Sequence, residues 1–144
     1  MTKQEQRCIF CDIASAKESS YKILENDKFI VILDAFPITE GHTLVIPKSH
    51  KKDVLELTRQ ETADLFTLAR DIAGVLVKQL EADSVNIATA PSVVPHFHLH
   101  IIPRYLYDMM GPLADLDNKR ELPKEVMERI QTKIKEGVNA LKEV

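Results

Sequence analysis

Residues 96–104 read HFHLHIIPR, in which three histidines occupy alternate positions of an otherwise apolar run. Side chains of a β-strand alternate between its two faces, so this spacing predicts a strand over residues 96–102. The imidazoles of His96, His98 and His100 then lie on one face of a sheet. Imidazole titrates near neutral pH, binds metals and acts as a nucleophile, which makes this face the first candidate for chemistry. The alternative is a strand whose polar face carries histidines that have no function.

Four other stretches predict strands of the same sheet. They are rich in β-branched or aromatic residues and are bounded by turn residues, and they comprise residues 21–25, 29–33, 43–47 and 84–89. The first three follow one another closely and predict an antiparallel meander. The fourth precedes the histidine run and predicts its antiparallel neighbour. We therefore expect an antiparallel sheet of about five strands.

Helical periodicity predicts one main helix and one C-terminal helix. The main helix begins after Thr58, with Glu61 as its capping-box partner, and continues to about Gln79. The C-terminal helix covers residues 123–144, with an apolar stripe of Val126, Ile130, Ile134 and Leu141. Between the sheet and this helix, residues 108–122 predict a surface loop. Together these elements predict the α+β class.

Composition excludes two classes of function. The net charge of −3 argues against a surface that binds nucleic acid strongly. No apolar stretch reaches the roughly 18 residues of a transmembrane helix, so we expect no membrane partner. Residues 1–7 are polar and no hydrophobic signal region follows them, which predicts a cytoplasmic protein.

The two cysteines, Cys8 and Cys11, form a C-x-x-C pair. In a reducing compartment such a pair is a metal clip or a redox pair more often than a structural disulfide. A redox pair is expected at a helix N-terminus in a βαβ unit, and no strand pattern precedes Cys8. A zinc site needs two further ligands, for which histidines are the natural candidates.

Read together, the H-x-H-x-H run, Asp34, the segment GHTLVIPKSH at residues 41–50 and the C-x-x-C pair resemble the histidine triad (HIT) family. The resemblance covers residues 8 to about 105. It implies a HIT-like fold, with residues 1–108 as the HIT domain. Residues 109–144 are then a C-terminal loop and helix that pack on this domain or on a dimer partner. The implied activity is that of a nucleotide hydrolase or nucleotidyl transferase acting on a purine nucleotide or nucleotide conjugate, and the implied assembly is a homodimer.

By the same resemblance, the histidines form the catalytic group. His98 is the implied nucleophile, which attacks the α-phosphorus and forms a nucleotidyl-histidine intermediate that water hydrolyses. The neutral imidazole attacks through one nitrogen only if a nearby acceptor holds the proton on the other. His100 is expected to contact the phosphate oxygens or the leaving group as a donor or a cation. His96 precedes them, and His42 completes the group unless it is a surface histidine of the turn at Gly41.

The resemblance also implies a structural zinc ion. In a subset of bacterial HIT proteins a C-x-x-C pair and two histidines hold the metal, and the matching residues are Cys8, Cys11, His50 and His96. Two thiolates and two imidazoles complete a tetrahedral Zn²⁺ site and leave no open position. The alternative is a pair of small buried cysteines and an exposed His50.

The nucleoside is implied to bind near Asp34, whose carboxylate accepts hydrogen bonds from the ribose hydroxyls. An apolar wall for the base comprises Ile9, Phe10, Ile13 and Leu33. Residues 86–96 lack the Asn-x-Gly and Ala-Gly-Gln segments of many HIT proteins, and Ser92, within a Pro-Ser pair like that of the aprataxin-like and scavenger decapping branches, is the candidate phosphate ligand. This departure leaves two alternatives open: a nucleotide-binding or sensor module with little turnover, and a zinc-stabilised dimeric adaptor.

Overall fold

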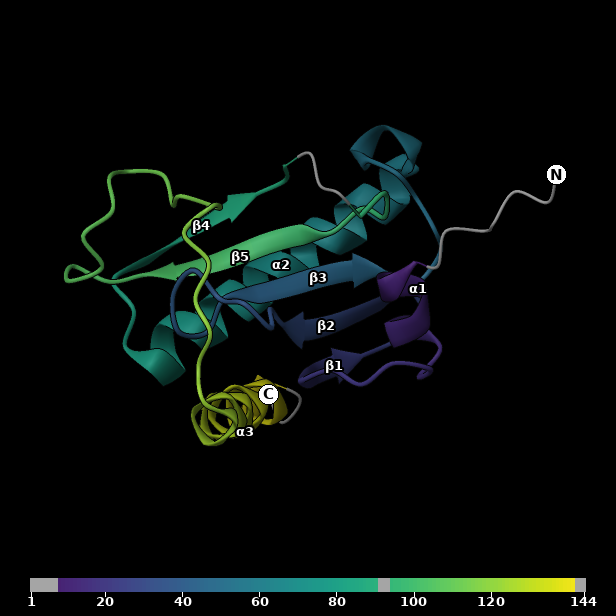
Figure 1. Ribbon diagram of the computed structural model, residues 1–144. Helices are drawn as coiled ribbons and strands as arrows, with labels where there is room; N and C mark the ends of the chain where they lie inside the picture. Colours follow the sequence, from purple (N-terminus) through teal and green to yellow (C-terminus); the bar gives the residue numbers. More distant parts are fainter. Residues whose placement is uncertain (1–7, 91–93, 142–144) are drawn as a thin grey trace, which may run out of the picture.

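One antiparallel sheet, with strands in the order β1-β2-β3-β5-β4, runs through the molecule (Figure 1). The computed structural model describes residues 8–90 and 94–141. The strands in these ranges are β1 (Lys22–Glu25), β2 (Phe29–Leu33), β3 (Thr43–Pro47), β4 (Ser84–Ala88) and β5 (Leu99–Arg104). The helices are α1 (Ile9–Ala14), the 3-10 turn η1 (Val54–Glu56), α2 (Arg59–Leu80) and α3 (Lys124–Leu141). The predicted α+β class with a five-stranded antiparallel sheet is confirmed.

Strands β2 and β3 are buried on both faces, which accounts for their unbroken apolar sequences. Val31 and Val45 face the main hydrophobic core, to which α2 and α3 contribute. Ile30 and Ile46 face a smaller cluster that contains Phe10 of α1. Figure 1 shows α2 behind the sheet, and α1 in front of one end of it. The long helices therefore close one face of the sheet, while the short helix α1 covers only part of the other.

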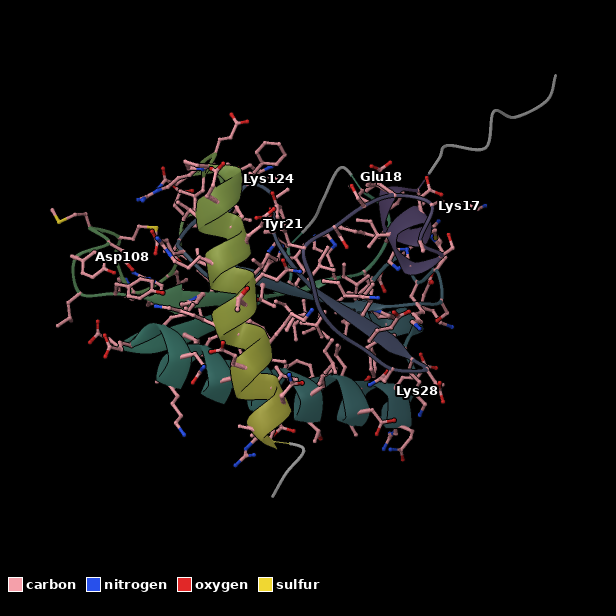
Figure 2. The ribbon with its side chains drawn as sticks, turned by 90° about the horizontal axis from the view of Figure 1, so that it is seen from below. Lys17, Glu18, Tyr21, Lys28, Asp108 and Lys124 are labelled. Carbon is pink, nitrogen blue, oxygen red and sulfur yellow. The ribbon has the colours of Figure 1, made fainter. Side chains whose placement is uncertain are left out.

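Helix α2 begins at the predicted cap, where Oγ1 of Thr58 accepts the N–H of Glu61 at 3.0 Å. Helix α3 crosses α2 (Figure 2), and its buried residues are Met127, Ile130, Ile134 and Val138. Leu141, predicted to share this stripe, is the last residue of α3 and is 48% exposed, so the stripe ends at Val138. A glycine permits the close contact of the two helices, since a Cβ atom on Gly137 would lie 2.6 Å from Val75. None of the described helices is long and apolar enough to cross a membrane.

The strand that carries the histidine run differs from its prediction, because it begins at residue 99 rather than residue 96. Its neighbour β3 pairs with it only through residues 43–45, and the chain before Leu99 leaves this ladder although β3 itself continues to Pro47. There the backbone bonds to a loop instead, as the N–H of Phe97 donates to the carbonyl of Lys51 at 2.6 Å. Phe97 and Leu99 still enter the main core, so the side chains alternate as predicted. Only His100 of the three histidines lies within the strand.

Candidate functional site

A cavity of about 900 Å³ lies on the sheet face opposite α2. Its walls come from α1, the ends of β2 and β3, the turn after β2, and the chain between β5 and α3. The predicted site residues that line it are Ile9, Phe10, Ile13, Leu33, Asp34, His42, His98 and His100. The structure thus brings the predicted nucleophile, its neighbours and the predicted nucleoside wall to one cavity. The side chain of His96 is not part of its lining.

Two of the histidines form a hydrogen-bonded pair. His42 is 2% exposed, its Nδ1 accepts the N–H of Ile38 at 3.1 Å, and its Nε2 lies 2.9 Å from Nδ1 of His100. Because a backbone donor occupies Nδ1, neutral His42 carries its proton on Nε2 and donates it to His100. Neutral His100 then carries its own proton on Nε2. The alternative of His42 as a surface histidine is wrong, because its side chain is buried.

Burial keeps this pair uncharged at neutral pH. Burial, followed by the positive charge of His98, lowers the pKa of His42 to about 3. Burial and the neighbouring His42 lower the pKa of His100 to about 4. In this structure each histidine is therefore a neutral hydrogen-bond donor, which favours the first of the two roles expected for His100.

Within residues 8–90 and 94–141, His98 has a hydrogen-bond partner at only one of its two ring nitrogens. Its Nδ1 lies 2.8 Å from the carbonyl oxygen of His96. A carbonyl only accepts hydrogen bonds, so Nδ1 carries the proton and Nε2 keeps its lone pair. The ring packs between Phe10 and His100, with ring centroids 4.7 Å and 4.9 Å away. A neighbouring acceptor therefore fixes the tautomer that a nucleophilic imidazole needs.

Asp34 directly follows β2, and its carboxylate lies beside His42 of the histidine pair. Its Oδ1 accepts the N–H of Phe36 at 2.9 Å, and its Oδ2 lies 3.7 Å from Nε2 of His42. Burial raises the pKa of Asp34, while the N–H of Phe36 opposes this shift. The bond to Phe36 fixes the orientation of the carboxylate and leaves Oδ2 as an acceptor toward the cavity.

The predicted metal ligands form a separate cluster at the N-terminal end of α1. Nδ1 of His96 lies 3.3 Å from Sγ of Cys8 and 3.4 Å from Sγ of Cys11, and Nδ1 of His50 lies 3.2 Å from Sγ of Cys11. All four ligand atoms lie within 4.8 Å of one another. Nε2 of His96 donates to the carbonyl of Pro47 at 2.8 Å, so its Nδ1 lone pair points toward the sulfurs.

These distances fit a tetrahedral zinc site. Zn–S and Zn–N bonds of about 2.3 and 2.0 Å at tetrahedral angles give S···N separations of about 3.5 Å. Burial and the neighbouring Cys8 raise the pKa of the Cys11 thiol to about 11, so a bound cation would be needed to hold this sulfur as a thiolate at neutral pH. The donor set is closed, with no position left for a substrate, which is the structural type of site.

Part of the cavity wall comes from residues that were not predicted to belong to the site. The segment predicted as a surface loop supplies Leu116, Asp117 and Lys119, and the first turn of α3 supplies Lys124. No motif or periodicity marks these residues, so the sequence holds no signal that places them there. Ser92, the candidate phosphate ligand, lies outside the described residues.

Comparison with known proteins gives a consistent result. The family model described as HIT domain matches residues 15–106. An uncharacterized HIT-like protein of Mycoplasma genitalium is 47% identical over 121 residues, which cover 80% of this chain and 86% of that protein.

Two solved structures share the fold over most of their length. A hypothetical histidine triad nucleotide-binding protein of Sulfolobus tokodaii has a TM-score of 0.83 at 33% identity and covers 94% of each chain. A zinc-bound histidine triad family protein of Mycobacterium smegmatis has a TM-score of 0.79 at 31% identity, covering 94% of this chain and 96% of its own.

Proposed function

The chain belongs to the histidine triad family, and from this premise we propose that it cleaves nucleotide conjugates at the α-phosphate through a nucleotidyl intermediate on His98. The observation that carries the proposal is the state of His98, whose Nδ1–H is held by the His96 carbonyl while Nε2 is free. The candidate substrates are an adenosine phosphoramidate, a dinucleoside polyphosphate or an adenylate.

The proposed reaction has two displacements. Nε2 of His98 attacks the α-phosphorus, the bond to the leaving group breaks, and the leaving group departs with the electron pair of that bond. The positive charge that forms on the imidazole is stabilised through Nδ1–H by the carbonyl of His96. Nε2–H of His100, oriented by His42, donates to a phosphate oxygen or to the leaving atom. A water molecule then attacks phosphorus, the electron pair of the P–N bond returns to Nε2, and the proton that water loses passes to solvent and balances the proton taken up by the departed leaving group. Neutral His98 and a nucleoside monophosphate are released.

The apolar wall of the cavity supports a nucleoside as the invariant part of the substrate. Phe10 and Ile13 of α1 and Ile32 of β2 belong to the smaller apolar cluster and line the cavity together with Asp34. A purine base stacks and packs on such a surface, and a carboxylate at its edge suits the two hydroxyls of ribose.

Replacing Asp34 with asparagine tests this assignment. The variant Asp34→Asn is expected to lower kcat/KM about 10- to 100-fold for a ribonucleotide conjugate, because hydrogen bonds to a charged acceptor contribute about 1.5–3 kcal/mol. The matched 2′-deoxyribonucleotide conjugate forms fewer of these bonds and is expected to lose much less. Equal losses for both substrates, measured by steady-state kinetics, would contradict the contact with ribose.

The activity itself is tested with a fluorogenic AMP-amidate. The wild-type protein is expected to release AMP with multiple turnovers. Binding of the nucleotide without turnover would favour the alternative of a sensor module, and the absence of both would favour the adaptor.

The proposal includes a structural zinc ion held by Cys8, Cys11, His50 and His96. When bound, this ion supplies a cross-link rather than a reactive group, because its coordination is complete. The residues around it have a second effect on the site. His96 joins the cluster through its side chain and holds His98 through its carbonyl, so the metal ligands position the nucleophile without contacting the substrate.

The proposed partner is a second copy of the chain. β4 forms an edge of the sheet, Ile87 on it is 41% exposed, and the apolar side chains exposed after β5 are Leu106, Tyr107, Met109 and Leu113. An exposed strand edge flanked by apolar residues is a site of association. Light scattering after size-exclusion chromatography is expected to give twice the chain mass of 16.3 kDa. Ile87→Lys is expected to weaken the dimer, whereas Phe66→Glu on α2 is not, and a wild-type monomer at every concentration would reject the homodimer.

A further inference from the structure

The chain between β5 and α3 is fixed against the sheet at its beginning. We call residues 109–123 the strap; Figure 1 shows this segment descending in front of the sheet toward α3. The Arg104 guanidinium donates to the carbonyls of Gly111 at 2.6 Å and of Met110 and Pro112 at 3.2 Å. The same guanidinium pairs with Asp108 at 2.8 Å, in a bridge that is almost completely buried. The start of the strap is therefore held by side chains of β5 and the following turn.

Two more contacts fix the middle and the far end of the strap. Oδ1 of Asn86, on β4, accepts the N–H of Ala114 at 2.8 Å. The N–H of Arg120 donates to the carbonyl of Pro37, in the turn after β2, at 3.2 Å. Lys119 immediately precedes this second anchor and lines the histidine cavity. The strap is thus tied to both sides of the cavity, and its position there is a property of the fold.

The charges around the cavity explain why the position of Lys119 matters. The fixed charges that line the described part of the cavity are Asp34, Asp117, Lys119 and Lys124. Lys124 begins α3 (Figure 2) and lies 3.7 Å from a carboxylate oxygen of Glu128. No described acidic group pairs with Lys119 within salt-bridge distance. It is therefore a cation of the described wall that no described carboxylate engages, whereas Lys124 has an exposed carboxylate beside it.

Lys119 is also electrostatically close to the predicted binding groups. Against the effect of burial, which raises the pKa of Asp34, the positive charge of Lys119 lowers it. The same charge adds to the burial that lowers the pKa of His100. Lys119 thus acts on Asp34, where the proposed function places the ribose, and on His100, which the proposed function places against the phosphate.

We propose that Lys119, carried by the strap, binds the phosphoryl oxygens of the nucleotide. This inference rests on the proposed function and adds a binding residue outside residues 15–106, the part of the chain that the family model matches. The physical need is direct: His42 and His100 donate hydrogen bonds but carry no charge at neutral pH, and an anion in a partly buried cavity requires a counter-charge. The strap is then part of the binding site, with Arg104 and Asn86 as its positioning residues.

The test compares two ligands that differ only in the phosphate. Adenosine and AMP are titrated by NMR into the wild-type protein, Lys119→Met and Lys119→Arg. Lys119→Met is expected to raise the Kd of AMP about 10- to 100-fold, the range of a charge-assisted hydrogen bond, and to leave the Kd of adenosine unchanged. Lys119→Arg is expected to restore most of the AMP affinity. Lys135→Met, which removes an exposed lysine from α3, serves as the matched charge control and is expected to change neither Kd.

Three results would overturn the inference. Equal weakening of adenosine and AMP by Lys119→Met would assign Lys119 a role in the shape of the cavity. An unchanged Kd for AMP would show that the ammonium group does not reach the phosphate, and a wild-type protein that does not bind AMP would reject the proposed function as well. AMP is the product and needs no turnover, so a protein that binds AMP through Lys119 but releases none from the AMP-amidate would overturn the activity alone.

Discussion

Replacing His98 with asparagine is expected to reduce the release of AMP from a fluorogenic AMP-amidate by about 10⁴-fold or more. Nε2 of His98 is the only atom to which the proposed mechanism transfers the nucleotidyl group. The other histidines of the site therefore cannot replace it as the nucleophile. Asparagine is the preferred replacement because its amide N–H can still donate to the carbonyl of His96, which keeps the local structure. Thermal unfolding of His98→Asn should match that of the wild-type protein.

His100→Asn is the matched comparison for the same measurement. Its Nε2–H supplies a hydrogen bond in the mechanism rather than the attacking atom, so its loss is expected to cost only about 10²- to 10³-fold. Brief reaction followed by denaturation and mass spectrometry should show one nucleotidyl group on the wild-type protein and none on His98→Asn. A nucleotidyl adduct on His98→Asn, or equal rates for both variants, would contradict the assignment of the nucleophile.

Removing the zinc ligands is expected to have the largest effect on stability. Metal analysis of the purified protein should give about one zinc ion per chain, and Cys8→Ser should abolish this content. The proposed metal would join α1 to the loop after β3 and to the residues before β5, so its loss would remove a cross-link between segments distant in sequence. A loss of several kcal/mol is expected to lower Tm by about 10–20 °C, measured by calorimetry.

His50→Ala separates the metal from packing. His50 is exposed, whereas Cys8 packs against the smaller hydrophobic cluster, so a Tm loss in His50→Ala cannot come from a cavity in the core. In the presence of a strong chelator, the wild-type protein and His50→Ala should unfold at the same temperature. A metal-free wild-type protein with an unchanged Tm would reject the structural zinc.

The sequence pattern was sufficient wherever structure follows from local periodicity. The capped start of α2 at Thr58 and the apolar runs of β2 and β3 lie where their patterns predict them. The start of β5 could not be predicted in this way, because the backbone before Leu99 bonds to the loop at Lys51 and not to β3. The alternation of side chains around Phe97 was predicted correctly. Phe97 and Leu99 both enter the main core, although the backbone at Phe97 is not paired with a neighbouring strand.

The candidate site shows the same division. The clustering of His42 with His100, and of the cysteines with His50 and His96, agrees with the family resemblance of the sequence. The strap was not predictable, because Arg104 holds it by donating to backbone carbonyls, which every sequence possesses. No residue type in the strap therefore marks Lys119 as a neighbour of the cavity.

The division of β2 between two hydrophobic clusters also determines how the molecule opens. Val31 and Leu33 belong to the main core, whereas Ile30 and Ile32 hold α1 through the smaller cluster. The free energy of detaching α1 is therefore set by a few apolar contacts and the metal ligands, and not by the global free energy of unfolding. The wall proposed to hold the nucleoside is thus expected to fluctuate as a unit of its own while the sheet and both long helices remain folded.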